Sequence, residues 1–146
     1  MIWRLASRAD IPAVAAMLAD DMLGRARESA DLALYLAAFD AMQAEGANHL
    51  IVGEDAGQVV ACYQITFISG LSLAAARRAQ IEGVRVASSH RGQGVGAAMI
   101  ADAEARARAA GCSLMQFTTN KVRSDAHRFY DRMGFTPSHI GYKKAI

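Results

Sequence analysis

The chain has 146 residues, of which 53% are hydrophobic and 21% are charged, and its net charge is +2. This length suits one domain, and the composition is that of a folded globular protein rather than a disordered one. So small a net charge gives no reason to expect a nucleic-acid partner. No apolar run is long enough for a transmembrane helix, and the N-terminus lacks the regions of a signal peptide. Cys62 and Cys112 lack the spacing of a metal site or a disulfide framework. Composition therefore predicts a single cytoplasmic domain over residues 1–146, with no metal and no membrane partner.

The first half of the chain predicts a strand, two helices and a β-hairpin, in that order. Residues 1–6 are expected to form a strand, after which Asp10 and Pro12 begin a helix that ends near Gly24. A second helix is expected from Leu32 onward, because apolar residues recur there at helical spacing, and Gly46 is expected to end it. The hairpin has expected strands at residues 49–54 and 59–68 and a turn at 55–58.

The second half predicts alternating strands and helices. A loop at residues 69–76 leads into a strand at 77–86, and a helix is expected from Gly94 to Ala110. The remaining elements are an expected strand at 113–119, a helix at 124–133 and an edge strand at 138–144. This order predicts an α/β fold, with a mixed sheet and helices on both of its faces.

The most informative segment is an apolar strand that ends in a glycine-rich turn. Residues 84–86 lead into a polar loop, and Gly92, Gly94 and Gly96 then open an alanine-rich helical run. The N–H groups in the first turn of a helix lack helical partners, and the helix dipole adds about half a positive charge there. Glycines have no Cβ atom to keep an anion away from these donors. The segment therefore predicts a site for a phosphorylated ligand.

Two common phosphate-binding motifs do not fit this segment. Residues 92–97 match the pattern G-x-G-x-x-G/A, but a dinucleotide site also needs an acidic residue about 20 positions later. Residues 112–117 contain no acidic residue, and about 50 residues after the loop are too few for a doubly wound fold. The chain also contains no G-x-x-x-x-G-K-[ST] motif. Nicotinamide, flavin and P-loop sites are therefore not expected.

Two motifs together resemble those of the GCN5-related N-acetyltransferase (GNAT) superfamily. Arg91-x-x-Gly94-x-Gly96 is similar to the pyrophosphate-binding motif of that superfamily. The run from Asn120 to Phe135 resembles its N-x(5)-A-x(3)-Y-x(3)-G-F element. The resemblance extends over essentially the whole chain. It implies a mixed, mostly antiparallel sheet of about six or seven strands, splayed at the cofactor site, with about four helices on its two faces.

The resemblance also assigns roles to individual residues. It implies acetyl-CoA as co-substrate, with the pantetheine arm along the backbones of Val84 and Val86 and the pyrophosphate at residues 91–96. Tyr130 matches a tyrosine that lies near the thioester sulfur in many members. The implied cofactor contacts are Val84, Arg85, Val86, Arg91, Gly92, Gln93, Gly94, Val95, Gly96, Asn120 and His127.

Acetyl transfer to an amine needs a base, an oxyanion donor and an acid. An alkyl amine has a pKa near ~10.4, so a base must take its proton at neutral pH. Glu82 is the expected base, because it lies two residues before Val84 on the same strand. A backbone N–H at the splayed strand is the expected oxyanion donor, and Tyr130 is expected to protonate the leaving thiolate. Each has a structural alternative, since Glu82 can pair with a neighbouring arginine and Tyr130 shares a helix face with apolar residues.

The acceptor is expected to be a primary amine of a small molecule or peptide, acetylated directly in a ternary complex. In this architecture its site lies in the first two helices and the loop between strands, here residues 20–35 and 69–78. Four acidic residues there can attract a cationic amine: Asp20, Asp21, Glu28 and Asp31. The alternative is a sensor or scaffold of the same fold that binds acetyl-CoA without turnover. A homodimer through the C-terminal edge strand is a further expectation.

Overall fold

The computed structural model describes residues 1–20, 25 and 28–146. These residues form two compact units, residues 1–116 and residues 117–146. The first helix ends at Ala19. Gly24, near which its end was expected, and the acidic residue Asp21 lie outside the described residues.

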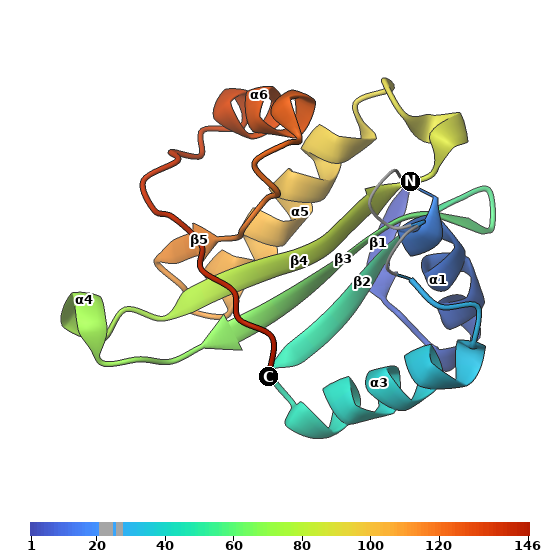
Figure 1. Cartoon of the computed structure of the whole chain (residues 1–146), viewed down its shortest axis with the longest axis horizontal. Helices are drawn as coiled ribbons and strands as arrows, with labels where there is room; N and C mark the ends of the chain where they lie inside the picture. The colour runs from blue at the N-terminus through green and yellow to red at the C-terminus, as the bar shows by residue number, and fades with distance from the viewer. Residues whose placement is uncertain (21–24, 26–27) are drawn as a thin grey trace. The chain divides into compact units, whose positions relative to one another are not determined.

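The first unit contains a mixed sheet with the strand order β1-β2-β3-β4-β5 (Figure 1). Neighbouring strands are antiparallel from β1 to β4, and β4 and β5 are parallel. The strands are β1 (Ile2–Leu5), β2 (Asn48–Asp55), β3 (Gln58–Ile68), β4 (Arg78–Val86) and β5 (Leu114–Gln116). The mixed α/β fold is therefore confirmed, although the described part of the chain contains five strands rather than six or seven.

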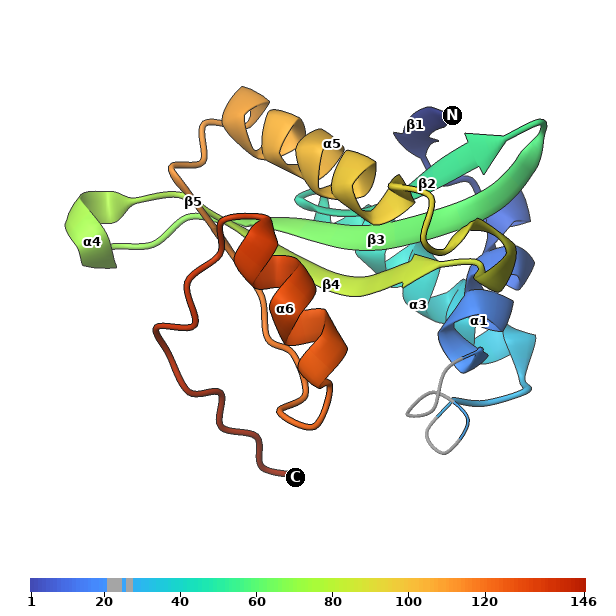
Figure 2. The same ribbon diagram turned by 90° about the horizontal axis from the view of Figure 1, so that it is seen from above.

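Helices cover both faces of this sheet, as the sequence predicted. Figure 2 shows α1 (Ile11–Ala19) and α3 (Leu32–Glu45) on one face and α5 (Val95–Ala109) on the other. The first face buries a cluster of apolar residues. Its members are Ala6, Ile11, Val14, Met17, Phe39, Val52 and Cys62. Burying one such aliphatic side chain contributes about 1.5–3 kcal/mol, so this packing holds α1 and α3 against the strands.

Backbone conformation explains the two turns at the ends of β3. The β2–β3 turn contains Ala56 and Gly57 with φ of 47° and 77°, the left-handed values that a two-residue hairpin turn requires. The β3–β4 connection contains α4 (Ser72–Ala75), where a loop was expected. Leu73, Ala74 and Ala75 have φ of 55°, 56° and 59°, so this segment is a left-handed turn rather than a right-handed helix.

The N-terminus is organised by the carboxylate of Asp10. The helix α1 begins after Asp10 with proline in its first turn, as predicted. The Asp10 side chain does not cap that turn, however. It accepts hydrogen bonds from the backbone N–H of Ser7 at 2.7 Å and from the guanidinium of Arg4 at 2.8 and 2.9 Å. Arg4 also donates to Glu54 on β2 at 2.9 Å, so the cluster joins β1, β2 and the start of α1.

The second unit contains α6 (Ser124–Arg132), close to the predicted helix at 124–133. Its aromatic residues form one cluster, in which the ring of Tyr130 lies 4.1 Å from that of Phe117. Two sequence predictions near the C-terminus are wrong. The strand expected at 113–119 is limited to β5, and residues 138–144 are exposed and form no strand. The alternation there is too weak to define a buried face, which a strand needs to fix its register.

Candidate functional site

A β-bulge interrupts β4 at Gly83, next to the expected cofactor segment. Gln64 of β3 pairs with Glu82, and Cys62 pairs with Arg85, so Gly83 and Val84 both lie opposite one residue of β3. Gly83 has a φ of 59°, the left-handed value that glycine adopts in this type of bulge. Sequence reasoning missed this feature, although an isolated glycine inside a strand is its usual signal.

Beyond the middle of β4, its outer edge has no strand partner in the described part of the first unit. The parallel pairing with β5 covers only three positions, from Arg78 to Gln80. The chain of β4 continues to Val86, where only β3 pairs with it. The bulge and the end of β5 together leave the outer edge of residues 81–86 without a strand partner among the described residues. A ligand with amide groups can add to such an edge as a further strand does.

The glycine loop forms an anion-binding geometry at the start of α5. Gly92 and Gly94 have φ of 74° and 80°, and Gly94 is the N-cap of α5. The backbone N–H groups of residues 92–97 form no backbone hydrogen bond with any described residue, whereas that of Ala98 already bonds to Gly94. A Cβ atom at Gly92 or Gly94 would meet no atom within 4 Å, so the loop surface there is open. Free donors at a helix N-terminus with an open approach suit a phosphate group.

Two arginines are bound to the carbonyl groups of the expected pantetheine segment. The Arg85 side chain is buried and donates to the carbonyl of Val84 at 2.8 Å. Arg91 donates to the carbonyl of Val86 at 3.0 Å and to the carbonyl of Asp20, at the end of α1, at 3.2 Å. These bonds tie the glycine loop to β4 and to α1.

The thiol of Cys62 lies beneath the bulge. Its Sγ donates to the carbonyl of Gly83 at 3.7 Å, and the residue is fully buried. Burial raises the pKa of this thiol to about 12, which keeps it protonated and makes it a poor nucleophile at neutral pH.

Glu82, the expected base, is exposed on the α1/α3 face of the sheet, directly before the bulge. Arg77 is one of the two arginines, with Arg85, that the sequence offered as structural partners of Glu82. It donates instead to the hydroxyl of Ser69 at 2.9 Å and stacks on Phe67.

The remaining expected site residues belong to the second unit. Tyr130 lies within the aromatic cluster, with the ring of Phe129 at 5.1 Å and that of Phe135 at 5.9 Å. The carbonyl of Asn120 accepts from Nε2 of His127 at 3.1 Å, so that nitrogen carries a proton. This bond links Asn120, the first residue of the run that resembles the second family motif, to His127 on α6.

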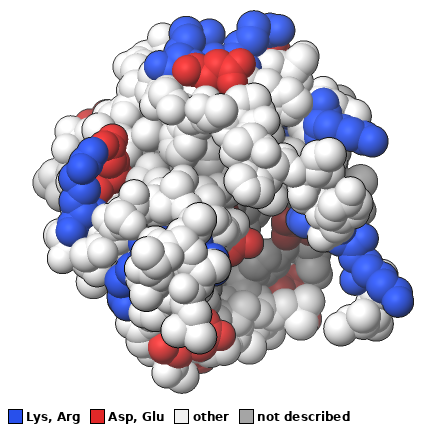
Figure 3. Space-filling view, turned by 90° about the vertical axis from the view of Figure 1, so that its left-hand side faces the viewer, with Lys and Arg blue, Asp and Glu red and all other residues white. Residues whose placement is uncertain are grey.

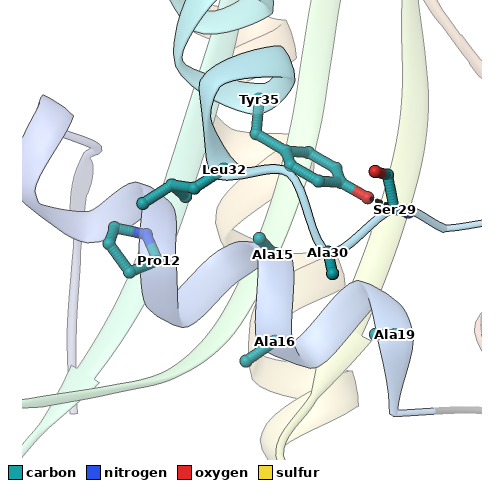
Figure 4. A pocket seen from close by; sticks show the side chains of 8 residues that line it. All are labelled: Pro12, Ala15, Ala16, Ala19, Ser29, Ala30, Leu32 and Tyr35. Atoms are coloured by element: carbon teal, nitrogen blue, oxygen red, sulfur yellow. Dashed lines mark hydrogen bonds between the residues drawn. The ribbon is translucent and has the colours of Figure 1, made fainter.

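The acidic residues expected to attract an amine have structural partners. Asp20 forms an ion pair with Arg91 at 3.4 Å, Glu28 accepts from the hydroxyl of Tyr35 at 2.7 Å, and Asp31 caps α3 through the N–H of Ala33. Beside them lies a cavity of about 280 Å³ between α1 and α3 (Figure 4). It is lined by Pro12, Ala15, Ala16, Ala19, Ser29, Ala30, Leu32 and Tyr35. Among the described residues, this lining is mostly apolar and contains no charged side chain, so it has no carboxylate to bind a cationic amine.

The charged side chains on the face in Figure 3 do not form one large patch of a single sign. On the face in Figure 3, Lys and Arg side chains occur in separate groups, several of them beside Asp or Glu. Among the described residues no cluster of His, Cys, Asp and Glu could hold a metal ion. No helix in the described ranges is long and apolar enough to cross a membrane.

Comparisons with known proteins show the family and the fold of the chain. The acetyltransferase (GNAT) family model matches residues 14–135. An aminoalkylphosphonate N-acetyltransferase from Salmonella typhimurium is 43% identical over 67 residues, which cover 46% of this chain and 44% of the relative. The match therefore spans less than half of the length of that curated relative.

Solved structures match along the whole chain. The structure of a transcriptional regulator from Bacillus halodurans C-125 is 40% identical, with a TM-score of 0.95 over 99% of both chains. A glucosamine-6-phosphate N-acetyltransferase from Arabidopsis thaliana has a TM-score of 0.81 over 99% of this chain and 97% of its own. Its 17% identity makes this second likeness one of fold.

Proposed function

The chain belongs to the acetyltransferase (GNAT) family, and we propose that it transfers an acetyl group from acetyl-CoA to the primary amine of a small molecule or peptide. The observation that carries this proposal is the open glycine loop at the start of α5, next to the unpaired edge of β4. The loop supplies donors for a pyrophosphate, and the edge supplies backbone groups for an amide-bearing arm. The similarity to an aminoalkylphosphonate N-acetyltransferase supports an amine as the acceptor.

In this proposal the acceptor attacks the thioester directly. The amine nitrogen forms a bond to the acetyl carbon, the C–S bond breaks, and one proton leaves the nitrogen while the thiolate of CoA gains one. Glu82 receives the first proton, either directly or through water, and Tyr130 donates the second. A backbone N–H of Val84 or Val86 stabilises the oxyanion that forms between these steps. The products are an N-acetylated amine and free CoA.

A sensor that binds acetyl-CoA without turnover is the second candidate. One observation favours it: a structure that is 40% identical over nearly the whole chain is that of a transcriptional regulator. Such a role needs the same glycine loop and the same edge of β4 but no base and no acid. The two candidates therefore use the binding loop in the same way. They differ in whether Glu82 and Tyr130 take part in a reaction.

One experiment separates the two candidates. The full chain is mixed with acetyl-CoA and a panel of primary amines, and the release of CoA thiol is followed. Binding of acetyl-CoA is measured in parallel by calorimetry. Thiol release that depends on an amine supports the enzyme, and binding without release for any amine supports the sensor. If acetyl-CoA does not bind at all, both candidates are wrong.

A further inference from the structure

We propose that Arg78, Gln80 and Glu82 form the binding site for the acceptor, and that this acceptor is an amine carrying an acidic group. This inference rests on the proposed function and names the substrate class of the same site. The three residues are named together below as the β4 strip. Its charged ends have opposite signs, and an amide lies between them.

The three side chains of the β4 strip lie on one face of the sheet. They alternate along β4 with Ala79 and Ile81, which are 0% and 2% exposed. Gln80 lies opposite Thr66, and Glu82 lies opposite Gln64, on β3. Since Cys62 shares this alternation with Gln64 and packs in the α1/α3 core, the strip is on the α1/α3 face.

A row of polar side chains crosses the strands at the centre of the strip. Asn48, Thr66, Gln80 and Gln116 are direct neighbours on β2, β3, β4 and β5. Hydrogen bonds fix the two ends of this row. Asn48 accepts from Thr66 at 3.2 Å and from Gln64 at 2.8 Å, and Gln80 accepts from Gln116 at 2.8 Å. These bonds use the Gln80 oxygen, so its amide N–H groups remain available to a ligand.

The charged ends of the strip are not used by the described parts of the chain. Glu82 forms no hydrogen bond or ion pair with a described residue, and neither does the side chain of Arg78. The Nε atom of Arg78 is buried without a hydrogen-bond partner among the described residues, as are those of Arg77 and Arg85, so this feature does not distinguish Arg78 from them. The guanidinium charge of Arg78 therefore has no carboxylate partner among the described residues, and an acidic ligand would supply one.

The neighbouring residue Arg77 shows a different arrangement. It points to the opposite face, where it donates to Ser69 and stacks on Phe67. The two adjacent arginines therefore lie on opposite faces of the sheet. Arg78 shares a face with Glu82, and Arg77 does not.

The charge order of the strip fixes the orientation of the ligand. Glu82 directly precedes the bulge, so an ammonium group bound there lies beside the unpaired edge of β4, where acetyl-CoA is proposed to bind. Arg78 is four residues away, about 13 Å along the strand at ~3.3 Å per residue. An amine with an acidic group at its far end complements both charges. A diamine would place its second ammonium against Arg78, and like charges there would be unfavourable.

The test compares matched amines in a thiol-release assay with the full chain. One series consists of ω-aminoalkylphosphonates and ω-amino carboxylates of increasing chain length, and the other of amino alcohols and diamines of the same lengths. We expect kcat/KM for the best acidic amine to exceed that of its matched alcohol by tenfold or more. The phosphonate and carboxylate arms then show which acidic group is preferred.

Variants of the adjacent arginines test the role of the β4 strip. Arg78→Gln should lower kcat/KM for acidic amines about tenfold to a hundredfold, mainly through KM, and leave amino alcohols within about twofold. Arg78→Lys should recover part of this loss, because it keeps the charge but not the paired donors. Arg77→Gln removes the same charge on the opposite face and should leave the preference for acidic amines unchanged.

The outcomes separate this inference from the proposed function. Turnover that is equal for acidic and neutral amines, and unaffected by Arg78→Gln, would overturn the inference while the acetyltransferase proposal stands. No turnover of any amine would overturn the proposed function itself. If Arg78→Gln does not fold, Arg78→Lys carries the test, and an unaltered KM for acidic amines in that folded variant contradicts the inference.

Discussion

At the scale of single residues, the proposed chemistry depends on groups whose surroundings differ. Glu82 is exposed beside a bulge, whereas Tyr130 is packed against three phenylalanine rings. An exposed carboxylate can exchange protons with water, and a packed phenol is held in one orientation. These differences suit a base that accepts a proton from solvent-accessible substrate and an acid that must stay aligned with one atom.

For Tyr130 we predict a loss of turnover without a loss of binding. The neutral thioester sulfur is a poor acceptor, so the hydroxyl matters only when charge develops on sulfur. Tyr130→Phe should therefore lower kcat by about 10²–10⁴-fold and leave acetyl-CoA affinity nearly unchanged. The remaining ring keeps its contacts with Phe117 and Phe135, so stability should change by less than about 1 kcal/mol.

Single-turnover kinetics, which isolate chemistry from product release, check this prediction. Tyr142→Phe is the control, because this tyrosine is 90% exposed near the C-terminus. Wild-type single-turnover rates in a folded Tyr130→Phe variant would show that Tyr130 is not the acid.

For Glu82 we predict an effect on the pH profile. Glu82→Gln cannot accept a proton, so kcat should fall and the acidic limb of the pH–rate profile should disappear. Acetyl-CoA affinity should stay within a few-fold. Glu104→Gln on α5, which removes an exposed carboxylate paired with Arg108, should leave the profile as it is. An acidic limb that persists in Glu82→Gln would assign the base to another group.

At the scale of elements, the start of α5 is the feature on which cofactor binding depends. A side chain at Gly94 has to adopt a φ of 80° and would stand over the free N–H donors. We predict that Gly94→Val weakens acetyl-CoA binding more than tenfold, because a branched Cβ obstructs the backbone approach of the pyrophosphate.

Gly46 provides a matched control for this substitution. It has a φ of 76° at the end of α3, and a Cβ there would also meet no atom within 4 Å. Gly46→Val should therefore lose similar stability, about 1–2 kcal/mol, without losing affinity. Calorimetric affinities that are equal in the two variants would rule out the glycine loop as the pyrophosphate site.

At the scale of the whole molecule, the Arg4–Asp10 cluster links β1, β2 and α1 and should control stability in acid. Hydrogen bonds from Arg4 and Ser7 hold the pKa of the Asp10 carboxyl well below its ordinary value of about 3.9. The charged carboxylate therefore stabilises the folded state above about pH 4, and this contribution is lost as the pH falls further. Asp10→Asn should lower the free energy of unfolding at neutral pH by about 1–3 kcal/mol and flatten its decline in acid.

Urea unfolding across a pH series measures this effect. Asp40→Asn is the control, since Asp40 pairs with Arg8 on the surface and should contribute much less. Equal pH dependence of the wild type and Asp10→Asn would contradict the assignment.

The structure bears on the expected homodimer through the C-terminal segment, residues 138–144. The homodimer was expected through a strand at residues 138–144, and no strand forms there, so that expectation has lost its basis. The single domain over residues 1–146 stays a prediction, and the described residues form two compact units.

The sequence by itself determined most of the elements and the family, because the signals for both are local. Proline and glycine positions, apolar spacing and the turn at residues 55–58 correctly predicted β1, α1, α3 and the β2–β3 hairpin. The anion-binding conformation of the glycine loop was also predictable from the sequence. Its positive φ values and its free helix donors both arise within one short segment. The comparisons confirm the resemblance to the GNAT family that these motifs carried.

Only the tertiary structure shows on which face of the sheet a residue lies, which strand edge is free and which partner a side chain binds. The bulge at Gly83 depends on the register between β3 and β4, and the free edge of β4 depends on where β5 ends. The Asp10 carboxylate accepts hydrogen bonds from Arg4 instead of capping its own helix, because the guanidinium of Arg4 on β1 lies within hydrogen-bond distance. Arg78 and Arg77 are neighbours in the chain, yet strand alternation places them on opposite faces with different surroundings. Strand partners and burial depend on contacts between segments that are distant in the chain, and the local patterns of the sequence did not show these contacts.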